Sequence, residues 1–153
     1  MLSGRHFALQ NARMTRPAAP LLPRRACLLA LLPLAGGAAA QSEAALQQAM
    51  RQALALRDEA VRAGDQPYGA VVLRGDTVVG AAPSRVVTST DPTAHAEMEA
   101  IRDAARRLRT RDLSGCMLVS TSRPCRMCEA AAGWAGIARM VHGEALIDAG
   151  APR

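Results

Sequence analysis

Hydrophobic and polar positions follow clear periods along the chain after residue 40. From Glu43 to Ala63 apolar residues recur every three or four positions, which predicts an amphipathic helix. Ser42 is a good N-cap for this helix, and Gly64 ends it. Residues 68–73 and 77–82 are β-rich runs separated by Arg-Gly-Asp, a combination that predicts a hairpin.

The pattern then predicts two more helices and two more strands. Residues 82–91 are polar and without a period, so we expect a loop there, and Pro92 opens a helix that runs to about Leu108. The remaining elements are a strand over 116–119, a helix from Cys125 to about Trp134 and a short strand over 140–142. The order α-β-β-α-β-α-β predicts an α/β fold, a three-layer α/β/α arrangement around a mixed sheet.

Charge is distributed unevenly along the chain. With 153 residues, half of them hydrophobic, the chain is long enough for one domain with a core. The formal charge is +6, but residues 1–40 contain five arginines and no acid, so the charge of residues 41–153 is +1. A nearly neutral domain has no general electrostatic reason to bind a polyanion, and we therefore expect no nucleic-acid partner.

Residues 1–40 have the three-part pattern of a secretory signal peptide. A basic, acid-free start is followed by an apolar run at 26–40 that ends in small residues, which predicts cleavage after Ala40 and export to the periplasm. The pair Arg24-Arg25 suggests the twin-arginine route. The apolar run is shorter than the about 20 residues that span a bilayer, so we expect no stable membrane anchor. Without a functional leader the protein would stay in the cytoplasm.

Two short motifs contain the residues that could carry chemistry. Cys125 and Cys128 stand three residues apart at a predicted helix start, so both sulfurs face one side of the first turn, where the positive end of the helix dipole favours thiolates. His95 can supply a third ligand. Three ligands leave a fourth position for water, as in a catalytic zinc site, and Glu97 could then transfer protons to and from that water.

Two alternatives to a catalytic zinc site remain open on the residues alone. A Cys-x-x-Cys pair in an exported protein can be a redox dithiol or a disulfide. A structural zinc would need a fourth ligand, for which Cys116 or His142 is available. Cys116, however, stands in a predicted strand, where a buried small hydrophobic side chain is more typical.

Taken together, four segments of the chain resemble the cytidine deaminase-like superfamily. The segments are Pro-Tyr-Gly-Ala-Val at 67–71, Asp-Pro-Thr-Ala-His-Ala-Glu at 91–97, Pro-Cys-Arg-Met-Cys at 124–128 and Trp-Ala-Gly-Ile at 134–137. The H-x-E and P-C-x-x-C combination is a known signature of zinc deaminases. The match is most similar to the guanine deaminase and tRNA adenosine deaminase branch.

The resemblance implies that His95, Cys125 and Cys128 bind Zn²⁺ and that Glu97 carries the proton. It also implies hydrolytic deamination of a small-molecule nucleobase or nucleoside, with a purine such as guanine favoured, and a homo-oligomer as in other members. Around a ring placed over the zinc we expect Tyr68, Ser84 and Trp134 as substrate-binding residues. The alternative for Tyr68 and Trp134 is a place in the hydrophobic core.

The sequence departs from the superfamily pattern at three points. Ser84 stands where an Asn often hydrogen-bonds the base, and Arg123 stands where Glu usually precedes Pro-Cys. Relatives also continue past the fourth strand, so we expect the C-terminal strand and helix to be missing and the fourth strand to be an exposed edge. These departures keep two alternatives open: a catalytically impaired zinc-binding domain and a tRNA adenosine deaminase.

Overall fold

The computed structural model describes residues 41–153, and the predicted signal peptide lies outside this range. The elements are α1 (Glu43–Arg62), β1 (Gly69–Arg74), β2 (Thr77–Pro83), α2 (Ala96–Leu108), β3 (Cys116–Ser120), α3 (Arg126–Trp134), β4 (Arg139–His142) and β5 (Ile147–Gly150). Ser42 caps α1 as expected, its hydroxyl accepting the N–H of Ala45. Among the described residues, no helix is both long enough and apolar enough to cross a membrane.

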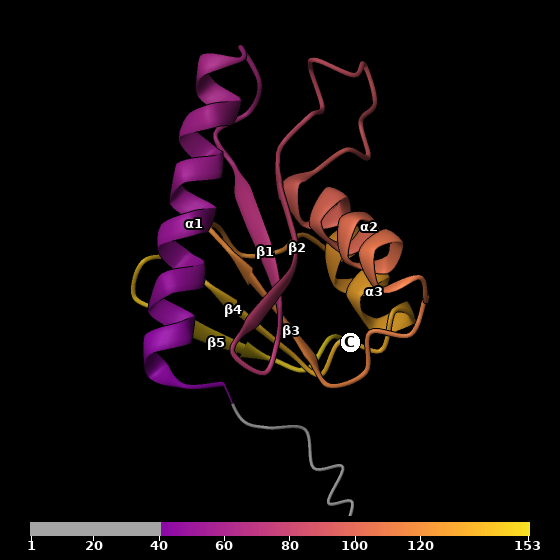
Figure 1. Ribbon diagram of the computed structural model, residues 1–153. Coiled ribbons are helices and arrows are strands. Elements are labelled where there is room, and N and C mark those ends of the chain that lie inside the picture. The colour runs from indigo at the N-terminus through magenta and orange to yellow at the C-terminus, as the bar shows by residue number, and fades with distance from the viewer. Residues whose placement is uncertain (1–40) are drawn as a thin grey trace, which may run out of the picture. The chain divides into compact units, whose positions relative to one another are not determined.

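The five strands form one mixed sheet in the order β2-β1-β3-β4-β5 (Figure 1). All neighbouring pairs are antiparallel except β3 and β4, which run parallel. A parallel pair needs a crossover connection, and α3 provides it. This connection places the start of α3 directly after the end of β3, next to the start of α2.

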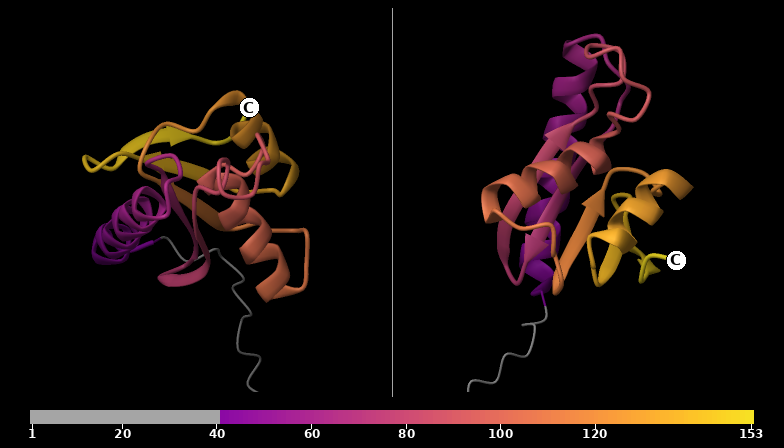
Figure 2. Two further views of the ribbon diagram at one scale, coloured as in Figure 1. Left: turned by 90° about the horizontal axis from the view of Figure 1, so that it is seen from above. Right: turned by 90° about the vertical axis from the view of Figure 1, so that its right-hand side faces the viewer.

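The two faces of the sheet are covered by different helices, as Figures 1 and 2 show. Because successive strand residues point to opposite faces, Val71 and Leu73 of β1 pack in the cluster under α1, whereas Ala70 and Val72 pack in the cluster under α2 and α3. β3 follows the same alternation. The predicted three-layer α/β/α fold is confirmed.

Two glycines let the helices approach the sheet closely. A Cβ on Gly69 would collide with the carbonyl oxygen of Ala53 in α1. A Cβ on Gly80 would lie 2.5 Å from the carbonyl oxygen of Ala100 in α2. Any larger residue at these positions would push a helix away from its strand, so both contacts fix the spacing between layers.

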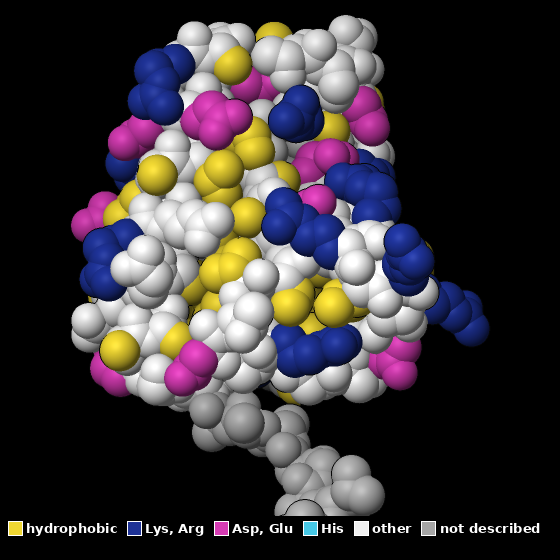
Figure 3. Space-filling view, in the orientation of Figure 1, with side chains coloured by type: hydrophobic (Ala, Val, Ile, Leu, Met, Phe, Trp, Pro, Cys, Tyr) yellow, Lys and Arg dark blue, Asp and Glu magenta, His cyan; other side chains and the backbone are white. Residues whose placement is uncertain are grey.

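β2 is the outermost strand on one side of the sheet. Its Ala81 N–H donates to the carboxylate of Asp103 on α2 (3.1 Å), and this carboxylate also pairs with Arg107 (2.8 Å). Hydrophobic side chains fill the band between α1 and α2 on this side of the molecule (Figure 3), and Val78 and Val79 of β2 are half-buried. The outer edge of the sheet is therefore partly covered by side chains of α2.

The expectation of a missing last strand is wrong. Residues Ile147–Gly150 form β5, which pairs antiparallel with β4, so β4 is not an edge. A turn closed by the bond from Leu146 N–H to Gly143 O reverses the chain, and Arg139 pairs with Asp148 across the two strands (2.7 Å). Residues 151–153 form no helix.

Candidate metal centre and active site

The four motif residues meet where α2 and α3 begin. His95 is the N-cap of α2, Cys125 is the N-cap of α3, and Cys128 lies in the first turn of α3. Neither cap residue makes a capping hydrogen bond through its side chain. The imidazole and the thiols are therefore directed to one another instead of to the helix ends.

The start of α2 differs from the prediction, which placed it at Pro92. The helix begins at Ala96, four residues later. Asp91 accepts hydrogen bonds from the backbone N–H (2.8 Å) and the hydroxyl (2.7 Å) of Thr93, and this local turn competes with helix formation. As a result His95 has an extended backbone, with φ −60° and ψ 151°, and can face α3.

The distances among the donor atoms fit a tetrahedral zinc ion. His95 Nδ1 lies 3.8 Å from Cys125 Sγ and 3.7 Å from Cys128 Sγ, and the two sulfurs are 3.6 Å apart. Standard Zn–S and Zn–N bond lengths in a tetrahedron require separations of about 3.5–3.8 Å. Within the described residues the group of donors consists of these three, and neither Cys116 nor His142 belongs to it.

The electrostatics of the cysteines also favour a cation. Burial raises the pKa of the Cys128 thiol, and the charge of Glu97 and the proximity of Cys125 raise it further. The N-termini of α2 and α3 act in the opposite direction because their dipoles favour negative charge. A bound dication would supply the missing positive charge and make the thiolate the stable form. The donor set therefore fits zinc both in geometry and in charge.

Glu97 lies beside this group in the first turn of α2. Its side chain is buried, and Oε2 lies 3.7 Å from Cys128 Sγ. Burial raises the pKa of Glu97, and the hydrogen bond from its own backbone N–H and the nearby His95 oppose this change only in part. A carboxyl group next to the metal donors, shielded from bulk water, is suited to accepting and returning a proton.

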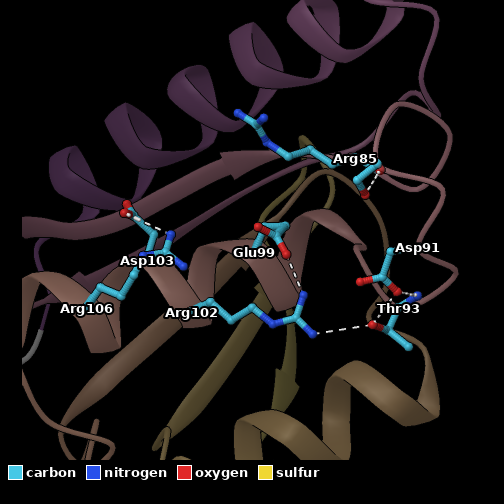
Figure 4. A network of polar contacts seen from close by, with 8 residues as sticks. Arg85, Asp91, Thr93, Glu99, Arg102, Asp103 and Arg106 are labelled. Atoms are coloured by element: carbon cyan, nitrogen blue, oxygen red, sulfur yellow. Dashed lines mark hydrogen bonds and ion pairs between the residues drawn. The ribbon is translucent and has the colours of Figure 1, made fainter.

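A loop over residues 84–94 connects β2 to His95. Its two ends are joined by the bond from Arg85 N–H to Ala94 O (2.9 Å). Figure 4 shows that Arg102 of α2 reaches Thr93, donating to its hydroxyl oxygen (3.4 Å), and that Arg102 also pairs with Glu99. These contacts tie the C-terminal end of the loop to α2 immediately before the metal donor.

The three substrate-binding candidates occupy different surroundings. Tyr68 is 39% exposed and its carbonyl accepts the N–H of Ser84 (2.9 Å). Ser84 is buried, and its hydroxyl donates to Asp65 (2.9 Å). The hydroxyl that we expected to contact a base is therefore already bonded within the protein. Tyr68 is too exposed to be a core residue.

The structure separates Trp134 from the metal donors. It is the last residue of α3, about 13 Å along the helix from Cys125, because an α-helix rises about 1.5 Å per residue. Its side chain is 89% exposed and borders a cavity of about 320 Å³ that Ile101 and Leu113 also line. Trp134 is therefore not a core residue, and it lies at the end of α3 opposite to the metal donors.

Sequence analysis missed Asp65, which the structure shows to be a centre of hydrogen bonding. This buried carboxylate accepts bonds from Gln66, Ser84, Val87 and Thr88. Three of these partners lie about 20 positions further along the chain, and no local pattern links them to an isolated acid after a helix.

A three-layer fold with a His-Cys-Cys donor group and an adjacent buried carboxylate defines the class of zinc-dependent deaminase domains. The chain belongs to the cytidine and deoxycytidylate deaminase zinc-binding family, whose characteristic region matches residues 43–144. This agrees with the resemblance seen in the motifs.

Curated relatives include enzymes with different substrates. The chain is 40% identical over 87 residues to guanine deaminase of Bacillus subtilis, covering 56% of each protein. It is 44% identical over 77 residues to tRNA-specific adenosine deaminase of Aquifex aeolicus, covering 49% of this chain and 51% of the relative. It is 43% identical over 107 residues to tRNA(Ile)-lysidine synthase of Deinococcus deserti, covering 69% of this chain and 20% of that protein. The chain thus spans from one fifth to about half of these relatives.

Solved structures show the same fold. Guanine deaminase from Bacillus subtilis superimposes with a TM-score of 0.61 at 36% identity, over 63% of this chain and 62% of that one. NE0047 in complex with 2,6-diaminopurine superimposes with a TM-score of 0.61 at 33% identity, over 63% of this chain and 55% of that one. The shared fold and the shared family leave the substrate of this chain to be inferred.

Proposed function

We propose that this protein is a zinc-dependent hydrolase that removes the amino group of a free nucleobase or nucleoside and releases ammonia, with a purine such as guanine as the favoured substrate. The observation that carries the proposal is the donor group itself. Three donor atoms lie at zinc-compatible distances, and the Glu97 carboxylate lies 3.7 Å from one of them.

Each residue of the site has a distinct part in this reaction. His95, Cys125 and Cys128 would hold the zinc, which when bound supplies Lewis-acid activation of water. Glu97 takes a proton from the attacking water and returns it to the leaving amino group. The ring carbon exchanges its C–N bond for a C–O bond, so water is consumed and ammonia is released.

The preference for a small purine has two supports. One relative is a guanine deaminase, and NE0047 binds 2,6-diaminopurine. A tRNA substrate, as in the adenosine deaminase relative, normally requires clustered basic residues to neutralise phosphates, whereas residues 41–153 carry a net charge of only +1. The charge balance therefore favours a small molecule over a nucleic acid.

The test is ammonia release by the purified, zinc-loaded protein from a matched panel of free bases and nucleosides at one concentration. We expect release with a purine to be fastest, and release by the Glu97→Gln variant to be slower by about 100-fold or more. A wild-type protein that holds one zinc per chain but releases no ammonia from any compound would instead favour the catalytically impaired zinc domain, to which the exposed Arg123 beside Pro124 points.

We also propose that the protein is exported to the periplasm. The support is the basic, apolar and small-residue pattern of residues 1–40, together with the arginine pair at 24–25. A folded-protein export route would allow zinc to be loaded before the two cysteines meet an oxidising compartment.

A further inference from the structure

Asp65 stands at the turn between α1 and β1, and it bonds to a loop far ahead in the sequence. One carboxylate oxygen accepts the N–H of Gln66 (2.8 Å) and the hydroxyl of Ser84 (2.9 Å). The other accepts the N–H of Val87 (3.0 Å) and both the N–H and the hydroxyl of Thr88 (2.8 Å each). Five donors thus converge on one side chain that is only 8% exposed.

These bonds act on the loop that leads to the metal centre. Ser84 begins the loop at the end of β2, and the main chain of the next residue, Arg85, bonds to Ala94, which directly precedes His95. The other end of the loop is held to α2 through Asp91, Thr93 and Arg102, as Figure 4 shows. Asp65 is therefore the anchor of the half of the loop that has no tie to α2.

The arrangement explains why a serine can stand at position 84. Its hydroxyl is short, buried and committed to Asp65, so its contribution is to shape the loop and not to reach a bound ring. The course of the main chain from Ser84 to Thr88 therefore depends on the carboxylate that holds it.

We propose that Asp65 is a positioning residue that fixes the 84–94 loop beside the metal donors and thereby sets the affinity for the base; this inference rests on the proposed deaminase function. Asp65 does not touch the reacting atoms. Its loss should leave the zinc ligands in place, because His95 and the cysteines are held by α2 and α3, but it should release the loop.

The test compares Asp65→Asn with the wild-type full chain. Asparagine has the same shape, but in either orientation its NH₂ group replaces a carboxylate oxygen that accepts at least one backbone N–H in the wild type, so that N–H loses its acceptor. We expect tryptic cleavage after the exposed Arg85 to accelerate by about tenfold, KM for the best purine to rise by about tenfold, and kcat to change by less than about threefold. Zinc content should stay at one per chain.

Matched variants separate positioning from general damage. Asp112→Asn removes a local carboxylate that bonds to Ser114 in another turn, and should leave cleavage after Arg85 and KM unchanged. Thr88→Val removes one of the five donors. It should raise the rate of cleavage after Arg85 and the KM as well, but each by less than Asp65→Asn does. Should Asp65→Asn fold poorly, this milder variant carries the test.

The role of Asp65 and the deaminase function can fail separately, because tryptic cleavage tests the first and ammonia release tests the second. Absence of ammonia release by the wild-type protein counts against the deaminase assignment, and the tryptic comparison then still decides whether Asp65 holds the loop. Unchanged cleavage after Arg85 in both Asp65→Asn and Thr88→Val would overturn the proposal. Faster cleavage with an unchanged KM would overturn it too, because the loop would then be irrelevant to the base.

Discussion

At the scale of single residues, the metal donors differ from the rest of the site in how directly the sequence specifies them. Cys125 and Cys128 are three residues apart on one helix, so helical geometry alone brings their sulfurs together. Asp65 is specified by contacts to a loop about 20 residues away, for which a single sequence contains no local signal. The metal ligands were therefore predictable from the sequence, whereas the role of Asp65 in holding the 84–94 loop was not.

Replacing a metal-binding cysteine should remove the metal. In Cys125→Ser or Cys128→Ser a hydroxyl replaces a thiolate that supplies one of three protein ligands, so most of the zinc affinity should be lost. Elemental analysis of the purified variants measures zinc per chain. Cys116→Ala is the control, since Cys116 is buried in β3 apart from the donor group and should leave zinc at one per chain. Full zinc in either serine variant would contradict the ligand assignment.

Glu97→Gln should keep the zinc and the fold while lowering kcat by about 100-fold or more, because an amide can neither take nor return a proton. Steady-state ammonia release together with zinc analysis checks this. Glu99→Gln is the matched control: Glu99 lies in the same turn but pairs with Arg102, and the variant should keep most of its activity. A Glu97→Gln variant within a few-fold of the wild type would reduce Glu97 to a structural role.

The contribution of Asp65 to stability should depend on pH. Burial alone would raise its pKa, but the hydrogen bonds from Thr88, Gln66 and Ser84 outweigh burial and hold the pKa well below the ordinary value near 4. A carboxylate with a lowered pKa in the folded state stabilises the protein above the unfolded-state pKa, and this stabilisation declines as the pH falls through the lower folded-state value.

Urea unfolding at two pH values tests this dependence. At pH 7, Asp65→Asn should lower the free energy of unfolding by about 1–3 kcal/mol, as expected when a buried donor loses its acceptor. At pH 3 the difference between variant and wild type should be smaller. An equal difference at both pH values would show that the charge on Asp65 is not what stabilises the loop.

At the scale of elements, α1, α3 and the first hairpin follow from periodicity and turn residues, and they were predicted within one or two residues of their bounds. β5 could not be predicted, because Ile-Asp-Ala-Gly combines low strand propensity with a glycine and is held by pairing to β4. The late start of α2 was missed for a similar reason, since the turn at Asp91 outcompetes the preference of Pro92 for a first helical turn.

The contact between α1 and β1 leads to a prediction about packing. Gly69→Ala should destabilise the protein by about 1–3 kcal/mol, because the added methyl group meets the main chain of α1 and one element must shift. Gly133→Ala is the control. That residue lies within α3 with its nearest neighbour, the Cβ of Pro152, at 3.5 Å, so alanine should be neutral or stabilise the helix by up to about 1 kcal/mol. Thermal unfolding followed by circular dichroism compares both, and equal melting temperatures for the two variants would contradict the packing account.

At the scale of the whole molecule, the charge of residues 1–40 differs from that of the folded domain, and this leads to a prediction about export. The mature protein should begin at Gln41, and changing Arg24 and Arg25 together to Lys should retain the precursor in the cytoplasm if the twin-arginine route is used. N-terminal sequencing and fractionation measure both. A periplasmic protein that still begins at residue 1 would contradict cleavage.

The carboxylate of Asp103 at the outer edge of β2 has a consequence for self-association. An edge strand with free N–H groups can template the addition of a strand from another chain, which is a route to aggregation. Asp103 occupies the N–H of Ala81 and places a charge, shared with Arg107, where an incoming strand would have to pair. The side chain of Asp103 thus hinders the addition of a strand from another chain at this edge of the sheet. The Asp103→Ala variant should precipitate more readily at high concentration, without altering the metal centre.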